Sequence, residues 1–136
     1  MKRALRNKIE IHKPDGIDWM NFRLSRDNPY TLHHIKEKRN GGDNSLQNLA
    51  ILTKMAHKLL NVLDKVCPDA YNDLQNVFRK INDSLCPPTE EIINEIDMIL
   101  YKVLVSHEYN MLTEIDLSNY VIYYNEGRKQ LKKCLK

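Results

Sequence analysis

The chain has 136 residues, of which 42% are hydrophobic and 29% are charged, as is usual for a globular protein with one modest core. The formal net charge is only +3, so the total charge neither requires nor excludes a nucleic-acid partner. Its distribution is uneven, because residues 1–66 hold 13 Lys or Arg against 7 Asp or Glu, and residues 67–136 hold 8 against 11. We therefore expect a polyanion to bind the amino-terminal half.

The sequence lacks the features of secreted and membrane proteins. The basic amino terminus has no apolar run typical of a signal peptide, and no later segment is long and apolar enough to span a bilayer. Cys67, Cys86 and Cys134 are odd in number and widely spaced, which fits neither a disulfide framework nor a zinc knuckle. We therefore expect reduced thiols, a cytoplasmic protein and no membrane partner.

A hairpin is predicted close to the amino terminus. Residues 1–13 form a basic leader, which is either an arm that lies on phosphate groups or a solvated segment. A Pro-Asp-Gly turn follows it. Partial alternation over residues 19–24 indicates a first strand with Trp19 as a core anchor, and the aromatic and β-branched run over residues 30–35 indicates a second strand paired with it.

Three of the five histidines cluster around one glycine turn, and this is the strongest chemical signal in the chain. His33 and His34 end the second predicted strand, where neighbouring side chains point to opposite faces, so the two cannot share one role. A charged loop with a Gly-Gly turn follows, and then a helix that carries His57 on its polar face. Asn61 lies one turn later on that face, at the spacing at which two helical side chains can share a ligand.

The rest of the chain is predicted to be helical. The helix after the Gly-Gly turn is expected over residues 49–66. Pro68 is placed to begin another helix, and Thr89 to cap a third. Residues 117–135 mix helical spacing with strand-like composition and contain Gly127, and we favour a helix there. The predicted class is α+β, in which a small ββα unit precedes a mostly helical region, with boundaries at 1–13, 14–66 and 67–136.

The histidine-rich stretch resembles the HNH endonucleases of the ββα-metal superfamily. That family is marked by a histidine pair, a glycine-rich turn, an Asn-Leu pair and a helical histidine nine residues after the asparagine. The matching residues occur here in the same order and at similar spacing, over about a third of the chain: His33-His34-Ile35, Gly41-Gly42, Asn48-Leu49, Leu52 and His57.

The resemblance implies a role for each matched residue. His34 corresponds to the general base that takes a proton from the attacking water, and Asn48 to the residue that holds the loop of that base. His33 and His57 correspond to metal ligands. Asn61 stands where many relatives have a further histidine and some use asparagine as a ligand, so its role as a third ligand stays open. The Cys-x-x-Cys knuckles of many relatives are absent.

Phosphodiester hydrolysis explains why these residue types are needed. A divalent ion neutralises charge that develops on the phosphate and the leaving oxygen, and an imidazole with the ordinary pKa of ~6.5 accepts the proton of water near neutral pH. The donor set favours Mg²⁺ or Mn²⁺ and also suits Zn²⁺ or Ni²⁺. The cations expected to contact phosphate, for which simple solvation is the alternative, are Arg23, Arg26, Lys36, Lys38 and Arg39.

We therefore expect a metal-dependent endonuclease whose substrate is DNA, with RNA as the less favoured alternative, and the resemblance implies that it leaves 5′-phosphate and 3′-hydroxyl ends. It would nick as a monomer, or cut both strands as a homodimer formed through the helical region. Two alternatives stay open: a catalytically inactive module that binds nucleic acid or a protein partner, and a helical assembly protein. The asparagine in place of a histidine at position 61 and the acidic carboxy-terminal half favour the inactive module.

Overall fold

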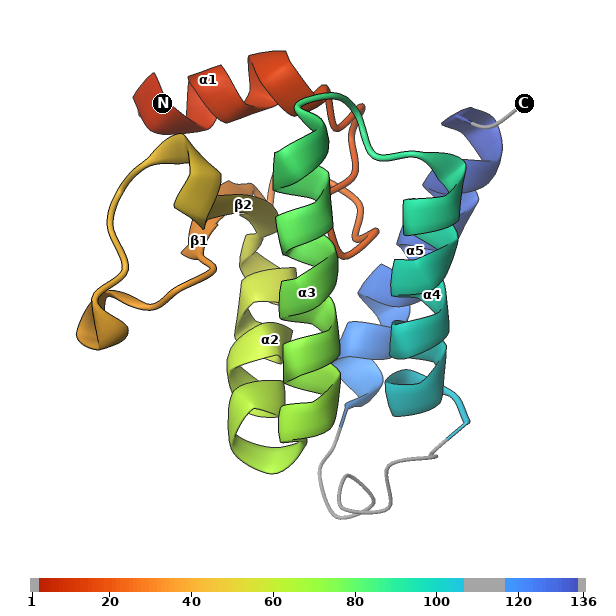
Figure 1. Ribbon diagram of the computed structural model, residues 1–136. Coiled ribbons are helices and arrows are strands. Elements are labelled where there is room, and N and C mark those ends of the chain that lie inside the picture. Colours follow the sequence, from red (N-terminus) through yellow and green to blue (C-terminus); the bar gives the residue numbers. More distant parts are fainter. Residues whose placement is uncertain (1–2, 107–116, 135–136) are drawn as a thin grey trace.

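In the computed structural model, which describes residues 3–106 and 117–134, a two-stranded sheet lies among helices (Figure 1). This architecture confirms the α+β class and the order of a small hairpin unit followed by a helical region. Two short 3-10 turns, Lys38–Asn40 and Leu46–Asn48, interrupt the loop between the strands. The helices and strands are α1 (Arg3–His12), β1 (Tyr30–His34), β2 (Leu49–Thr53), α2 (Lys54–Val66), α3 (Pro68–Ser84), α4 (Glu90–Leu104) and α5 (Ser118–Cys134).

The hairpin has a different partner strand from the one predicted. β1 pairs antiparallel with β2, with Tyr30 opposite Thr53 and His34 opposite Leu49. Residues 19–24 do not pair with β1, and the predicted first strand is therefore wrong. The cause is Asp18, whose Oδ1 accepts hydrogen bonds from the backbone N–H groups of residues 20 and 22 at 2.8 and 2.9 Å and so curls the segment into a turn. Trp19 is nevertheless a core residue, as expected.

The predicted helix over residues 49–66 is correct only from Lys54 onward. Its first five residues form β2, and all five are buried. A short apolar run that is buried on both faces has no alternating pattern, so periodicity does not distinguish it from a buried helix. The change from strand to helix occurs at Thr53, whose side chain caps α2 by accepting from the N–H of Ala56. His57 therefore lies in the first turns of α2.

The amino-terminal segment is an integral helix rather than a leader. α1 lies across one end of the molecule, next to the hairpin and the end of α3 (Figure 1). The side chain of Lys8 is only 1% exposed, and its Nζ contacts Asn82 Oδ1, the Leu46 carbonyl oxygen at 3.0 Å and His12 Nε2 at 3.3 Å. Lys8 therefore ties α1 to α3 and to the loop before β2, and it is unavailable to a phosphate backbone.

The helical region forms as predicted. α3 begins at Pro68, and the Thr89 hydroxyl caps α4 by accepting from the N–H of Ile92. α2 and α3 lie side by side, α4 packs against α3, and α5 contacts α2 and α4 (Figure 1). α5 confirms the preference for a helix near the carboxy terminus. The backbone of Asn21 comes so close to Gly127 that a Cβ there would lie 1.7 Å from the Asn21 carbonyl oxygen.

Two further observations concern the cysteines and the length and hydropathy of the helices. Cys67 is a buried free thiol and Cys86 an exposed one, whereas the side chain of Cys134 lies outside the described residues. Among the helices that the structure describes, none combines the length and the apolar character needed to cross a bilayer.

Candidate metal and catalytic site

Five of the predicted site residues line one pocket, namely the predicted phosphate contact Lys38 and four residues of the predicted metal and catalytic site. The end of β1 supplies His33 and His34, and α2 supplies His57 and, one turn later, Asn61. The pocket has a volume of about 250 Å³ and opens to solvent. The rings of His33 and His57 meet edge to face, with centroids 5.3 Å apart and an interplanar angle of 81°. The fold thus brings together side chains as far apart in the sequence as His33 and Asn61, which are separated by 28 positions.

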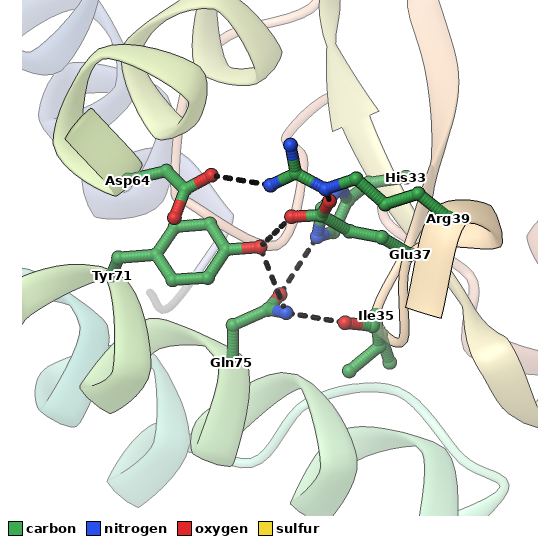
Figure 2. Close-up of polar contacts among 7 residues, drawn as sticks. All are labelled: His33, Ile35, Glu37, Arg39, Asp64, Tyr71 and Gln75. Atoms are coloured by element: carbon green, nitrogen blue, oxygen red, sulfur yellow. Dashed lines mark hydrogen bonds and ion pairs between the residues drawn. The ribbon is translucent and has the colours of Figure 1, made fainter. Parts of the chain in front are cut away.

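A glutamine from α3 fixes the protonation of the His33 ring (Figure 2). Gln75 Nε2 donates to the Ile35 carbonyl oxygen and to Tyr71 Oη, so the amide has only one orientation that avoids an oxygen–oxygen contact. Its Oε1 then lies 2.7 Å from His33 Nε2 and must accept a hydrogen bond from it. His33 therefore carries its proton on Nε2 and its lone pair on Nδ1.

A hydroxyl group of β1 orients His57 in the same manner. Thr31 Oγ1 donates its single proton to the Leu52 carbonyl oxygen, 2.9 Å away. The same oxygen lies 3.1 Å from His57 Nδ1 and can only accept there. His57 therefore carries its proton on Nδ1 and its lone pair on Nε2, so each of the two imidazoles has one lone pair left for a ligand.

Burial keeps both of these imidazoles neutral. Burial, together with the nearby rings of His57 and His34, lowers the pKa of His33 to about 4, although the bond to Gln75 opposes the shift. Burial also lowers the pKa of His57, and the proximity of His34 adds to the effect. A histidine binds metal only through a neutral ring. Both residues are therefore in the ligand-competent form at neutral pH.

The separation of the two rings is that of imidazoles that share one divalent ion. Rings that bind one ion through bonds of about 2.1 Å have centroids about 5 Å apart, which agrees with the 5.3 Å between His33 and His57. In the described part of the chain no three His, Cys, Asp or Glu side chains are arranged to hold a metal. The remaining positions would therefore fall to Asn61, which is exposed at the pocket edge, and to water.

His34 has surroundings unlike those of its neighbour. It is only partly buried, and its Nε2 lies 2.8 Å from Asn44 Oδ1. An amide oxygen can only accept, so Nε2 carries the proton and Nδ1 the lone pair. His34 also borders a second hollow of about 600 Å³, which runs toward α1. An imidazole with one nitrogen hydrogen-bonded to an acceptor and the ring reachable by water has the arrangement of a general base.

Asn48 closes the loop that follows His34. Its Oδ1 accepts from the N–H of Lys36 at 2.7 Å, and its Nδ2 donates to the carbonyl oxygens of Lys36 and Asp43 at 2.9 and 2.8 Å. Gly42 lets the loop fold back, because a Cβ there would lie 1.7 Å from the Lys36 oxygen. Asn48 does not line the pocket. It occupies the loop-holding position that the resemblance assigns to it.

The predicted phosphate contacts divide into two groups. Lys38 lines the pocket, and Lys36 and Arg39 lie on the same loop. Arg23 and Arg26 are exposed on the curled segment before β1 and do not line the pocket. The guanidinium of Arg39 is not a free cation, because it pairs with Glu37 and lies 3.6 Å from Asp64 (Figure 2).

Sequence reasoning missed the side chains that orient the three imidazoles. These are Thr31, Asn44 and Gln75. Only Gln75 carried a signal, because it lies among the apolar positions of α3, where a polar side chain needs a partner. Thr31 and Asn44 belong to an ordinary strand and an ordinary polar loop, and their roles depend on contacts across the fold.

Comparison of the chain with models of known protein families, with curated proteins and with solved structures found no match.

Proposed function

We propose that this protein is a metal-dependent endonuclease that hydrolyses DNA phosphodiester bonds. The observation that carries the proposal is the pocket in which the buried, neutral ring of His33 meets the half-buried rings of His57 and His34, each hydrogen-bonded to a separate side chain. A fold that needed these histidines only for packing would have no use for three imidazoles around one opening, each hydrogen-bonded to its own polar side chain. The HNH-like order of the residues supports the same activity.

The three imidazoles have different capacities for proton transfer. Since the pKa of His33 is about 4 and that of His57 is also lowered, these two rings are poor proton acceptors at neutral pH. His34 is the general base in this proposal. Its Nδ1 takes the proton of the attacking water while its Nε2–H stays paired with Asn44, so the imidazolium that forms keeps a hydrogen-bond acceptor.

The other residues bind and orient the substrate. His33 and His57, with Asn61, would hold a divalent ion such as Mg²⁺ or Mn²⁺, which neutralises charge on the phosphate when it is bound. Lys36 and Lys38 lie on the loop beside the base, where exposed ammonium groups attract the DNA backbone. Arg39 would contribute only after a phosphate oxygen displaced one of its two carboxylate partners.

Plasmid nicking tests the proposal. Supercoiled DNA incubated with the protein and Mn²⁺ or Mg²⁺ should be converted to the open circle, and His34→Ala should slow this by ~100-fold or more, because general-base catalysis contributes ~10² to 10⁴ in rate. Gln47→Ala is the matched control, since Gln47 is exposed on the same loop and does not line the pocket. Linear product that rises with protein concentration would indicate cutting by a dimer.

Two results would contradict a nuclease. One is the absence of nicking with each of Mg²⁺, Mn²⁺, Zn²⁺ and Ni²⁺, and the other is equal nicking by wild type and His34→Ala. DNA binding without nicking would favour the inactive module instead. The neutralised state of Arg39 is the structural observation that agrees with that alternative.

A further inference from the structure

We propose that Gln75 is a positioning residue for His33, so that α3 of the helical region completes the metal site of the ββα unit. The inference rests on the proposed function, because it assigns His33 the role of a metal ligand. It adds a residue that lies 42 positions away from His33 and outside the motif.

The amide of Gln75 is fully used and cannot turn. The side chain is 4% exposed, and each of its polar atoms has a partner. A flipped amide would place its oxygen against the Ile35 carbonyl oxygen and its NH₂ group against His33 Nε2. The first contact is repulsive, so the backbone of Ile35 fixes the orientation and Gln75 transmits it to His33.

This orientation determines which ring nitrogen of His33 can bind an ion. With Oε1 accepting from Nε2–H, the lone pair is on Nδ1. Without that acceptor, a buried Nε2–H would have no partner, and the ring would favour the tautomer that leaves Nε2 bare and places the proton on Nδ1. A proton on Nδ1 removes the lone pair that the ion needs, so metal affinity should fall by ~10- to 100-fold.

A second contact of Gln75 links the site to the loop that carries Lys36, Lys38 and Arg39, the predicted phosphate contacts (Figure 2). Tyr71 Oη accepts from Gln75 Nε2 at 3.2 Å and donates to Glu37 Oε1 at 3.2 Å. Glu37 in turn pairs with Arg39. Because burial and nearby carboxylates raise the pKa of Tyr71 to about 12, the phenol remains a donor at neutral pH. Tyr71 thus anchors the loop, whereas the Ile35 carbonyl oxygen is what orients Gln75.

The tautomer of His33 can be measured directly on the metal-free full chain. Long-range ¹H–¹⁵N correlation spectra distinguish the two neutral forms of imidazole, and the His33 signals can be identified by their loss in His33→Gln. We expect the Nε2–H form in wild type and a shift toward Nδ1–H in Gln75→Met. Tyr71→Phe should keep the Nε2–H form, because the Ile35 carbonyl oxygen still orients the amide.

Calorimetric titration with Zn²⁺ provides the second measurement. Gln75→Met should bind ~10- to 100-fold more weakly than wild type. Asn72→Met places the same side chain one turn earlier on the exposed face of α3 and should bind like wild type. If Gln75→Met does not fold, Gln75→Leu decides, because it also removes the acceptor of Nε2–H. A shift toward the Nδ1–H form in Gln75→Leu supports the proposal, and retention of the Nε2–H form overturns it.

The proposal is overturned if Gln75→Met folds, keeps the Nε2–H form and binds Zn²⁺ within twofold of wild type. This outcome differs from failure of the nuclease proposal. A protein that nicks no DNA but changes its His33 tautomer in Gln75→Met retains the positioning role and loses only the nuclease activity. If instead nicking depends on His34 but the His33 tautomer is the same in wild type and Gln75→Met, the nuclease activity is retained and the positioning role of Gln75 is lost.

Discussion

Two adjacent histidines of one strand have different properties because they point in opposite directions. His33 is buried against α3 with Gln75 as its partner, and His34 faces water with Asn44 as its partner. The covalent chemistry of the two rings is identical. Exposure and the hydrogen-bond partner therefore determine which ring suits a metal ion and which suits a proton.

Position 61 is where the site departs most from the HNH pattern, because it holds asparagine where many relatives have histidine. The variant Asn61→His tests the geometry of the site without an activity assay. A third imidazole on the pocket edge should tighten Zn²⁺ binding by ~10-fold or more, since His is a stronger zinc ligand than an amide. Competition with a chromophoric chelator measures the affinity. Lys58→His is the control, because it adds an imidazole to the exposed side of the same helix, away from the pocket. Equal Zn²⁺ affinity in the two variants would show that Asn61 does not face the ion.

At the scale of elements, the amphipathic helices and the strand β1 could be predicted, and the partner strand of β1 could not. α3, α4 and α5 each present an apolar stripe at helical spacing, and Pro68 and Thr89 mark two of their starts. The sheet depends on contacts between distant residues. Asp18 Oδ2 accepts from the N–H of Thr53 at 2.6 Å, which fixes the end of β2, while Oδ1 curls the segment that was expected to pair with β1. Local patterns contain neither of these contacts.

Gly127 shows how a contact between elements can reverse a local preference. In an isolated helix, the substitution Gly127→Ala would stabilise the helical conformation by ~1 kcal/mol. Here the added Cβ would lie 1.7 Å from the Asn21 carbonyl oxygen, and the backbone shift needed to relieve such an overlap costs ~1 to 3 kcal/mol or more. Because an overlap of this size with backbone belongs at the upper end of that range, we expect a net loss of about 2 kcal/mol in the free energy of unfolding, measured in urea. Asn125→Ala, exposed on α5, should lose nothing. A Gly127→Ala variant as stable as wild type would mean that α5 packs differently.

At the scale of the whole molecule, the convergence of the histidines could be predicted, but what surrounds them could not. The resemblance of the motif to HNH endonucleases implied that His33, His34 and His57 share one site, and helical spacing placed Asn61 beside His57. The spacing could not reveal that α3 covers the hairpin and buries His33, nor that burial makes its ring so weakly basic. Long-range packing also placed the carboxylate of Asp18 inside the core, where its pKa is raised to about 6. Stability and site chemistry therefore depend on the same buried ionisable groups.

These two buried groups predict opposite dependences of stability on pH. The pKa of His33 falls from about 6.5 in the unfolded chain to about 4 in the fold, so its contribution to stability is complete above pH 6.5 and is lost as the pH falls toward 4. The pKa of Asp18 rises to about 6, so its contribution is complete below its unfolded pKa of ~3.9 and is lost as the pH rises through 6. The contributions of His33 and Asp18 to the pH dependence of stability nearly cancel in the wild type. They can be separated only by comparing the wild type with a variant that lacks one of the two groups.

We therefore expect the stability of the wild type, measured by urea unfolding, to change in opposite directions relative to two variants, His33→Gln and Asp18→Asn, when the pH is lowered from about 7.5 to about 4.5. Relative to His33→Gln, the wild type should lose about 3 kcal/mol on acidification, since a shift of one pKa unit corresponds to ~1.4 kcal/mol. Relative to Asp18→Asn, it should gain stability over the same range, by roughly 2 kcal/mol. Each comparison cancels the other titrating groups, including His12 and His57, because both proteins contain them. A difference from His33→Gln that does not change with pH would mean that His33 is not buried as a neutral ring, and the assignment of its lone pair to a metal would fall with it.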